Sequence, residues 1–225
     1  MAEPPPVALC AEELSRVVAW MRGFLEGQYV LAVHTGTYCR DEFYAEPFLG
    51  SYRQAVAGGV RATTYKGGHF SFPAYMTGIL EGAGLLAALS CAPGYQESAC
   101  DAEWVGAPLG GGYLALENPA LDEGQGTRSG VFEIPLGNSG EGPDDANTLY
   151  NEKVETDRLI AVYDAIADRA RRLGRPQFVH YLFHNTSITE PFYLERFQRV
   201  IDHARGHGGV VATPSAAKAA FDALG

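Results

Sequence analysis

The stretch from Gln177 to Gly209 restricts the possible folds more than any other part of the sequence. Residues 178–183 are apolar, β-branched or aromatic, which is typical of a buried strand. Four polar residues, His184 to Ser187, follow this strand, and from Pro191 apolar residues recur at the three- and four-residue spacings of a helix. This order predicts polar side chains at the carboxyl end of a strand, where α/β proteins hold their functional groups.

The same order of strand, polar loop and helix recurs along the chain and predicts an α/β protein with mostly parallel strands. We predict helices at residues 11–26, 47–57, 73–81, 154–173, 215–224 and from residue 191. Strands are predicted at residues 29–33, 60–65, 85–89, 113–116, 131–136, 178–183 and 210–212. Residues 91–150 are rich in glycine, proline and acidic residues and are interpreted as a loop region within one domain spanning 1–225. The pattern alone does not separate a deformed barrel from an open sheet.

Charge and composition exclude several classes of partner. The net charge is −10 and the isoelectric point is about 5.0, which argues against binding to nucleic acid or to anionic membranes. The sequence has no apolar run long enough to span a membrane, and its first residues lack the pattern of a signal peptide. The four cysteines form no CxxC pair. We therefore expect a cytoplasmic protein with reduced thiols, whose partner is a small molecule or a carbohydrate.

Three histidines, His34, His69 and His184, lie at or just after the ends of predicted strands. Imidazole serves both as a zinc ligand and as a proton donor near neutral pH. Asp41 is close to His34 in the sequence and could act as an oxygen ligand or as a general base. We predict that His34, Asp41 and His69 bind a divalent metal, with zinc as the first expectation, and that the metal activates water. The alternative is that each histidine is a hydrogen-bonded loop or core residue.

Arg61 is a charged residue in the otherwise strand-like run at residues 60–65. Its guanidinium could hold a catalytic carboxylate in position. A salt bridge at the rim of the sheet would explain it equally well, and both interpretations stay open.

Three segments resemble polysaccharide deacetylases of the NodB-homology type. Residues 60–94 (VRATTYKGGHFSFPAYMTGILEGAGLLAALSCAPG) resemble the middle of these domains, and residues 131–137 (VFEIPLG) resemble the strand that follows. Residues 178–217 (FVHYLFHNTSITEPFYLERFQRVIDHARGHGGVVATPSAA) resemble the last two βα units of the family. The likeness covers about two-thirds of the chain as a profile and not as a strict motif.

The resemblance implies a deformed, possibly incomplete, (β/α) barrel and the metal-dependent removal of an acetyl group from a sugar amide. By position, His184 corresponds to the late catalytic acid of the family, and Arg61 corresponds to the arginine that orients the base. The end of the first predicted strand departs from the family: it reads VLAVHTGTYCRDE, with His34 where the family has the first aspartate of its Asp-Asp motif. Tyr38, and not a second histidine, lies four residues after His34, so the His-x-x-x-His pair is not found there. The proposed ligands His34, Asp41 and His69 therefore rest on position and chemistry alone.

Three functional hypotheses follow from the sequence. The first is a carbon–nitrogen hydrolase of the deacetylase type, in which Asp41, Arg61 and His184 act in catalysis. The second is a carbohydrate-binding or interaction protein that keeps the scaffold without the activity. The third is a glycosidase that uses paired carboxylates such as Glu42 and Glu133.

Overall fold

The computed structural model describes residues 50, 52–53, 56–59, 63–98, 101–116, 126–184, 187 and 189–225. The predicted helix at residues 11–26 and strand at residues 29–33 lie outside these residues, as do His34, Asp41, Glu42 and Arg61. The described part is mixed α/β, as the sequence predicts. Its sheets are small, and none of them closes into a barrel within the described residues.

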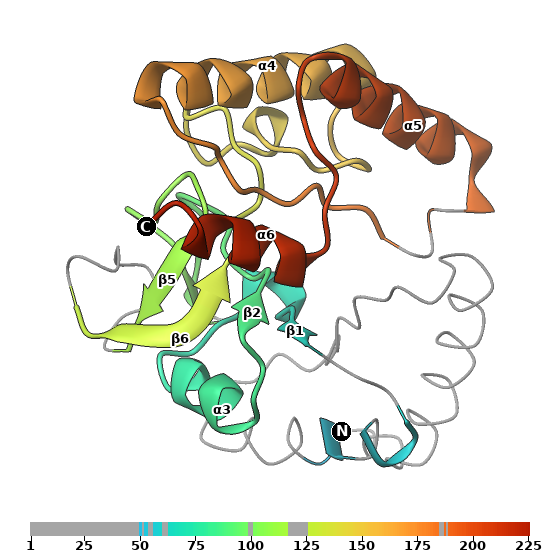
Figure 1. The fold of residues 1–225 in the computed structure, drawn as a ribbon. Helices are drawn as coiled ribbons and strands as arrows, with labels where there is room; N and C mark the ends of the chain where they lie inside the picture. The colour runs from blue at the N-terminus through green and yellow to red at the C-terminus, as the bar shows by residue number, and fades with distance from the viewer. Residues whose placement is uncertain are drawn as a thin grey trace.

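The main sheet has four strands in the order β1-β2-β6-β5 (Figure 1). They span Thr64–Tyr65, Ala87–Ala88, Arg128–Glu133 and Gly112–Ala115, respectively. β1, β2 and β6 run parallel, and β5 pairs with β6 in the antiparallel direction. The carboxyl ends of the three parallel strands therefore meet at one edge of the sheet. A separate antiparallel pair, β3 (Gln96–Glu97) and β4 (Ala102–Glu103), lies in the region interpreted as loops.

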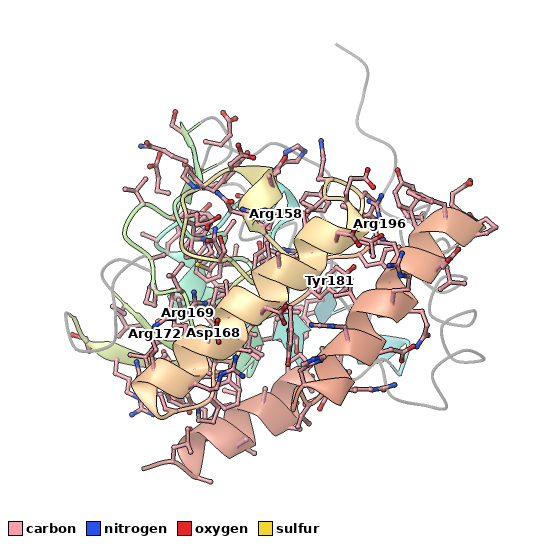
Figure 2. The ribbon with its side chains drawn as sticks, turned by 90° about the horizontal axis from the view of Figure 1, so that it is seen from above. Arg158, Asp168, Arg169, Arg172, Tyr181 and Arg196 are labelled. Carbon is pink, nitrogen blue, oxygen red and sulfur yellow. The ribbon has the colours of Figure 1, made fainter. Side chains whose placement is uncertain are left out.

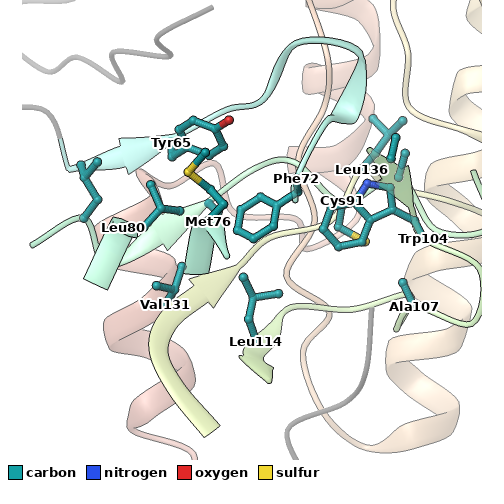
Figure 3. Packing of buried hydrophobic residues seen from close by; sticks show 14 residues of the cluster. Tyr65, Phe72, Met76, Leu80, Cys91, Trp104, Ala107, Leu114, Val131 and Leu136 are labelled. Atoms are coloured by element: carbon teal, nitrogen blue, oxygen red, sulfur yellow. The ribbon is translucent and has the colours of Figure 1, made fainter. Parts of the chain in front are cut away.

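Alternating residues of β6 face two different hydrophobic clusters, as the two-residue period of a strand requires. Val131 packs in a cluster with Met76 and Leu80 of α3 (Met76–Gly82), as Figure 3 shows. Phe132 packs in another cluster with Phe221 of α6 (Pro214–Asp222), and their ring centroids are 4.9 Å apart. β6 is thus buried on both faces, which is characteristic of strands in parallel sheets.

The helices α4 (Thr156–Leu173) and α5 (Pro191–Gly206) pack side by side on one side of the molecule (Figure 1). Both agree closely with the predicted helices, because each has a continuous apolar stripe and a clear end signal. Pro191 occupies the first turn of α5, and Gly174 ends α4 in the left-handed conformation at φ 63°. Buried apolar residues join the two helices, among them Val162, Ile166 and Val200.

Two predicted strands differ from the structure. Residues 178–183 are extended but form only single bridge pairs, between His180 and Leu136 and between Leu182 and Tyr150. Residues 210–212 form no strand, and Val210 is 88% exposed. An apolar β-branched run becomes a strand only where a neighbouring strand offers a hydrogen-bonding edge. Within the described residues, no strand lies beside residues 210–212.

Arginines of α4 and α5 hold the loops that the sequence left unassigned. Arg169 donates hydrogen bonds to the carbonyl oxygens of Leu109, Asn138 and Ser139, and so ties two loops to α4. Arg196 of α5 is only 3% exposed and donates to the carbonyl oxygen of Asn151 at 2.7 Å. Figure 2 labels both arginines on their helices. These bonds tie the loops at Leu109, at residues 138–139 and at Asn151 to α4 and α5.

We expect Phe132→Ala to lower the free energy of unfolding by about 3–5 kcal/mol, because it removes a fully buried ring from contact with Tyr113, Phe178 and Phe221. Urea unfolding followed by circular dichroism measures this change. The control Val210→Ala alters an exposed residue and should change the free energy by less than about 0.5 kcal/mol. Equal effects of the two substitutions would contradict the packing described for β6.

Candidate functional site

Five polar residues gather at the carboxyl edge of the parallel strands, and we name them the carboxyl-edge cluster: Lys66, Ser90, Cys91, Glu133 and His180. Lys66 directly follows β1, Ser90 and Cys91 follow β2, and Glu133 is the last residue of β6. His180 joins them because its segment pairs with Leu136, just beyond the end of β6. The parallel register therefore brings together residues that are far apart in the sequence.

Hydrogen bonds link the loops that carry the cluster. The Lys66 ammonium donates to the carbonyl oxygen of Leu89 at 2.7 Å, and its nitrogen lies 4.3 Å from the centroid of the Phe70 ring. The backbone N–H of Gly67 donates to Ser90 Oγ at 2.9 Å. The backbone N–H of Cys91 donates to Glu133 Oε1, also at 2.9 Å. Cys91 itself is a buried free thiol.

Two buried atoms of the cluster, Glu133 Oε2 and His180 Nε2, have no hydrogen-bond partner in the part of the chain that the structure describes. His180 Nδ1 lies 2.7 Å from the carbonyl oxygen of Ile134. A carbonyl oxygen can only accept, so Nδ1 carries the proton and Nε2 of the neutral ring presents a lone pair. Buried polar atoms without partners are costly and rare in folded proteins. These two atoms are therefore available to a bound molecule.

Burial shifts the pKa values of all the ionisable groups of the cluster. It raises the pKa of Glu133 to about 7, although the Cys91 N–H and the charge of Lys66 act in the opposite direction. It lowers the pKa of Lys66 to about 8, against the influence of Glu133 and Cys91. Burial is the main cause that holds the pKa of His180 well below its usual value, and the positive charge of Lys66 lowers it further. Burial is also the main cause that raises the pKa of the Cys91 thiol well above its usual value, and the negative charge of Glu133 raises it further.

Groups whose pKa values are displaced towards neutrality by burial and by specific neighbours are typical of functional sites. Glu133 and Lys66 can both gain or lose a proton between about pH 7 and 8. A carboxylic acid and an amine that both exchange protons near neutral pH can support acid–base chemistry or nucleophilic attack.

The loop that follows β1 has an unusual backbone. His69 and Phe70 are consecutive non-glycine residues in the left-handed region, at φ 49° and 58°. A Cβ atom at Gly67 would lie 1.8 Å from the carbonyl oxygen of Ser71, so only glycine fits there. Trp104, which is not part of this loop, stabilises it: the indole N–H donates to the carbonyl oxygen of Phe70 at 2.7 Å. Backbone strain of this kind collects at binding and catalytic sites.

His184, the acid predicted from the sequence, has a carboxylate partner that the sequence did not reveal. Its Nδ1 lies 3.4 Å from Glu152 Oε2, and its backbone N–H donates to Glu152 Oε1 at 2.7 Å. The 3.4 Å contact is an ion-pair distance and lacks the geometry of a hydrogen bond, so Oε2 keeps capacity for another donor. The His184 side chain is 41% exposed, whereas that of Glu152 is 13% exposed. Glu152 therefore orients a histidine that solvent or substrate can reach.

Aromatic rings connect His184 with the carboxyl-edge cluster. Phe70, beside Lys66, packs edge-on against Tyr95 with centroids 5.6 Å apart. The Tyr150 ring lies 5.7 Å from the His184 ring. Tyr95 is near enough to Tyr150 to contribute to its raised pKa, after the larger effects of burial, Glu152 and Asp145. The carboxyl-edge cluster and the His184–Glu152 pair thus lie in one region of the molecule.

The metal site predicted from the sequence is only partly within the described residues. His69 is exposed, in the strained loop after β1. His34 and Asp41 lie outside the described residues, as does Arg61, so the positions of these three predictions are untested. Within the described residues, no three His, Cys, Asp or Glu side chains converge as a metal would require. These residues alone do not supply a metal site.

Several members of the site were not among the candidates selected from the sequence. His180 lies within the predicted strand at residues 178–183 and not at its end, and Glu133 was named only for the glycosidase hypothesis. Lys66 and Cys91 follow the predicted strands at residues 60–65 and 85–89, so the rule that selected the histidines could have found them. Glu152 carries no such signal, because it lies next to no predicted strand.

Comparison of the chain with protein-family models, with curated proteins and with solved structures gave no match. The resemblance to polysaccharide deacetylases therefore remains a prediction. A separate search of the described helices found none with the length and apolar character needed to cross a membrane.

Replacing Glu133 should change how stability depends on pH. Its pKa is about 7 in the folded protein and about 4.5 in the unfolded chain, so its contribution to stability is present below pH 4.5 and is lost as the pH rises through 7. Relative to Glu133→Gln, the wild type should lose roughly 1–3 kcal/mol of unfolding free energy between pH 4.5 and 8. Urea unfolding at several pH values measures this difference.

The matched control is Glu97→Gln, which alters an exposed carboxylate in β3. Its difference from the wild type should stay constant over the same pH range. A Glu133→Gln difference that is equally constant would show that Glu133 is not held in a desolvated environment.

Proposed function

We propose that this protein is a hydrolase that removes an acetyl or related acyl group from the nitrogen of a sugar or small conjugate. The observation that carries the proposal is the His184–Glu152 pair beside the carboxyl-edge cluster, at the end of the sheet where parallel strands terminate. An exposed histidine oriented by a buried carboxylate is suited to give a proton to a leaving amine. His184 is also the residue that the deacetylase resemblance selects as the acid.

In the proposed reaction His184 protonates the nitrogen of the amide as the C–N bond breaks. Glu152 contacts the Nδ1 side of the ring, so Nε2 is the atom that faces the substrate. Glu152 accepts the His184 backbone N–H and lies beside Nδ1, so it can hold the ring in the orientation that this transfer needs. The proposal keeps Asp41 as the base and Arg61 as the residue that orients it.

The proposal includes a divalent metal ion, for which zinc is the first expectation. His34, Asp41 and His69 are the proposed ligands of this ion. When bound, such an ion lowers the pKa of a water molecule and polarises a carbonyl group. His69 supports this assignment in one respect: its loop leaves β1 at the edge where the carboxyl-edge cluster lies. Of the three proposed ligands only His69 lies within the described residues, which do not by themselves supply a ligand set.

The proposal extends to the fold, as a deformed (β/α) barrel of the deacetylase type. Three parallel strands with α3 and α6 on their two faces are compatible with part of such a barrel. Closure would need further strands, and the one predicted at residues 29–33 lies outside the described residues.

A carbohydrate-binding protein without activity is the second candidate. Phe70, Tyr95 and Tyr150 lie around the site, and flat aromatic rings form apolar surfaces against which sugar rings can pack. This alternative needs no metal and no proton transfer.

We expect His184→Ala to lower kcat for deacetylation of N-acetylglucosamine oligomers about 10²- to 10⁴-fold, because the leaving amine loses its acid. Glu152→Gln should lower kcat less, since the amide still accepts the His184 backbone N–H but carries no charge. Released acetate provides the assay. The control His207→Ala alters an exposed histidine at the end of α5 and should leave kcat unchanged.

Metal analysis completes this test. The proposal expects one zinc per chain, lost in His69→Ala. Unchanged activity in His184→Ala would refute the role of the acid. Absence of acetate release, together with oligomer binding that is weakened by Tyr95→Ala and Tyr150→Ala, would favour the binding protein.

A further inference from the structure

The sequence contains only three lysines, Lys66, Lys153 and Lys218, and their environments differ sharply. Lys153 is exposed to solvent. The ammonium of Lys218 donates to Asp222 at 2.8 Å, which raises its pKa. Lys66 alone belongs to the carboxyl-edge cluster: its nitrogen lies 4.3 Å from the centroid of the Phe70 ring, and the buried Glu133 influences its pKa.

The amine of Lys66 is held in place without being neutralised by a contact ion pair. One of its N–H groups donates to the carbonyl oxygen of Leu89, and the ring of Phe70 lies beside the nitrogen. Among the described residues, no carboxylate forms a salt bridge with it. Glu133 is nevertheless near enough to influence its pKa. A fixed amine in a desolvated environment is the arrangement that makes lysine a nucleophile at neutral pH.

Glu133 has the complementary property. Its Oε1 accepts the Cys91 N–H, whereas its buried Oε2 has no partner among the described residues. With a pKa of about 7, the carboxyl group is protonated in about half of the molecules at neutral pH. An amine and a carboxylic acid in this arrangement can act on the same carbonyl group, the amine on its carbon and the acid on its oxygen.

We propose that Lys66 is a nucleophilic lysine that forms an imine with a small aldehyde or ketone, and that Glu133 is the acid for this step. The proposal goes beyond acyl hydrolysis, because it requires neither a metal nor His184. It assigns a covalent role to the carboxyl-edge cluster, which the proposed hydrolysis does not use.

The step balances without a further reactant. The lone pair of the neutral Lys66 amine forms a bond to the carbonyl carbon, while the π electrons move to the oxygen, which takes the proton of Glu133. The Glu133 carboxylate then takes a proton from the new ammonium group. The carboxyl group returns that proton to the hydroxyl, which leaves as water while the nitrogen lone pair forms the C=N bond. The iminium nitrogen then gives its remaining proton to the Glu133 carboxylate, so the net change is amine plus carbonyl to imine plus water.

Reductive trapping tests the assignment on the full chain. The protein is treated with glyceraldehyde and sodium cyanoborohydride at pH 7, and peptide mass spectrometry measures the modification of each lysine over time. A pKa of about 8 in place of 10.5 increases the neutral amine roughly a hundred-fold or more. We expect Lys66 to react at least tenfold faster than Lys153 and Lys218. Equal rates, or slower reaction at Lys66, would overturn the proposal.

The substitution Glu133→Gln distinguishes a proton-donating role of Glu133 from a purely electrostatic effect on Lys66. The negative charge of Glu133 raises the pKa of Lys66, so its removal would increase the neutral amine and accelerate labelling if electrostatics were its only role. Loss of the acid would instead slow labelling, and we expect a decrease of at least tenfold. Faster labelling in Glu133→Gln would refute the role of Glu133.

Three further measurements exclude trivial explanations. In urea the three lysines should react at similar rates, because the selectivity depends on the fold. Lys66→Arg keeps the positive charge and should lose the adduct while retaining the wild-type circular dichroism spectrum. His184→Ala should be labelled like the wild type, so failure of the hydrolase proposal and failure of this one are distinguishable.

Discussion

The parallel pairing of β2 with β1 and β6 is the constraint on which the rest of the structure depends. The register sets Tyr65 beside Ala88, and Ala88 beside Glu133. The residues that follow β1 and β2 must therefore lie next to the end of β6. A shift of one residue would turn Glu133 to the opposite face, among Phe132 and its aromatic neighbours. The site exists because this register excludes that arrangement.

The buried ionisable groups oppose the stability that the core provides. Desolvation outweighs every favourable interaction in the pKa values of Glu133 and Lys66, although each group stabilises the charge of the other. A sheet selected only for stability would replace such groups with apolar residues of similar volume. Their presence beside a strained loop and two unpartnered atoms is better explained by chemistry than by folding.

The helices were predictable from the sequence to within a few residues, because their signals are local. The apolar stripe and Gly174 define α4, and Pro191 defines the start of α5. The short strands were less predictable. Residues 178–183 and 210–212 are both predominantly apolar and were both predicted as strands, yet only the first segment forms bridges. What separates them is the presence of a neighbouring edge, and this is a property of the tertiary structure.

For the site, the sequence was sufficient to place polar residues after the strands and His184 at the end of an extended apolar segment. The partners of these residues could be known only from the folded chain. Packing brought Glu152 to His184, although the two residues are far apart in the sequence. It also placed the half-buried Lys66 against the Phe70 ring of the strained loop, where Glu133 influences its pKa. The physical reason is that burial and pairing depend on long-range packing. The chemistry of a lysine or a carboxylate follows from that environment more than from its place in the chain.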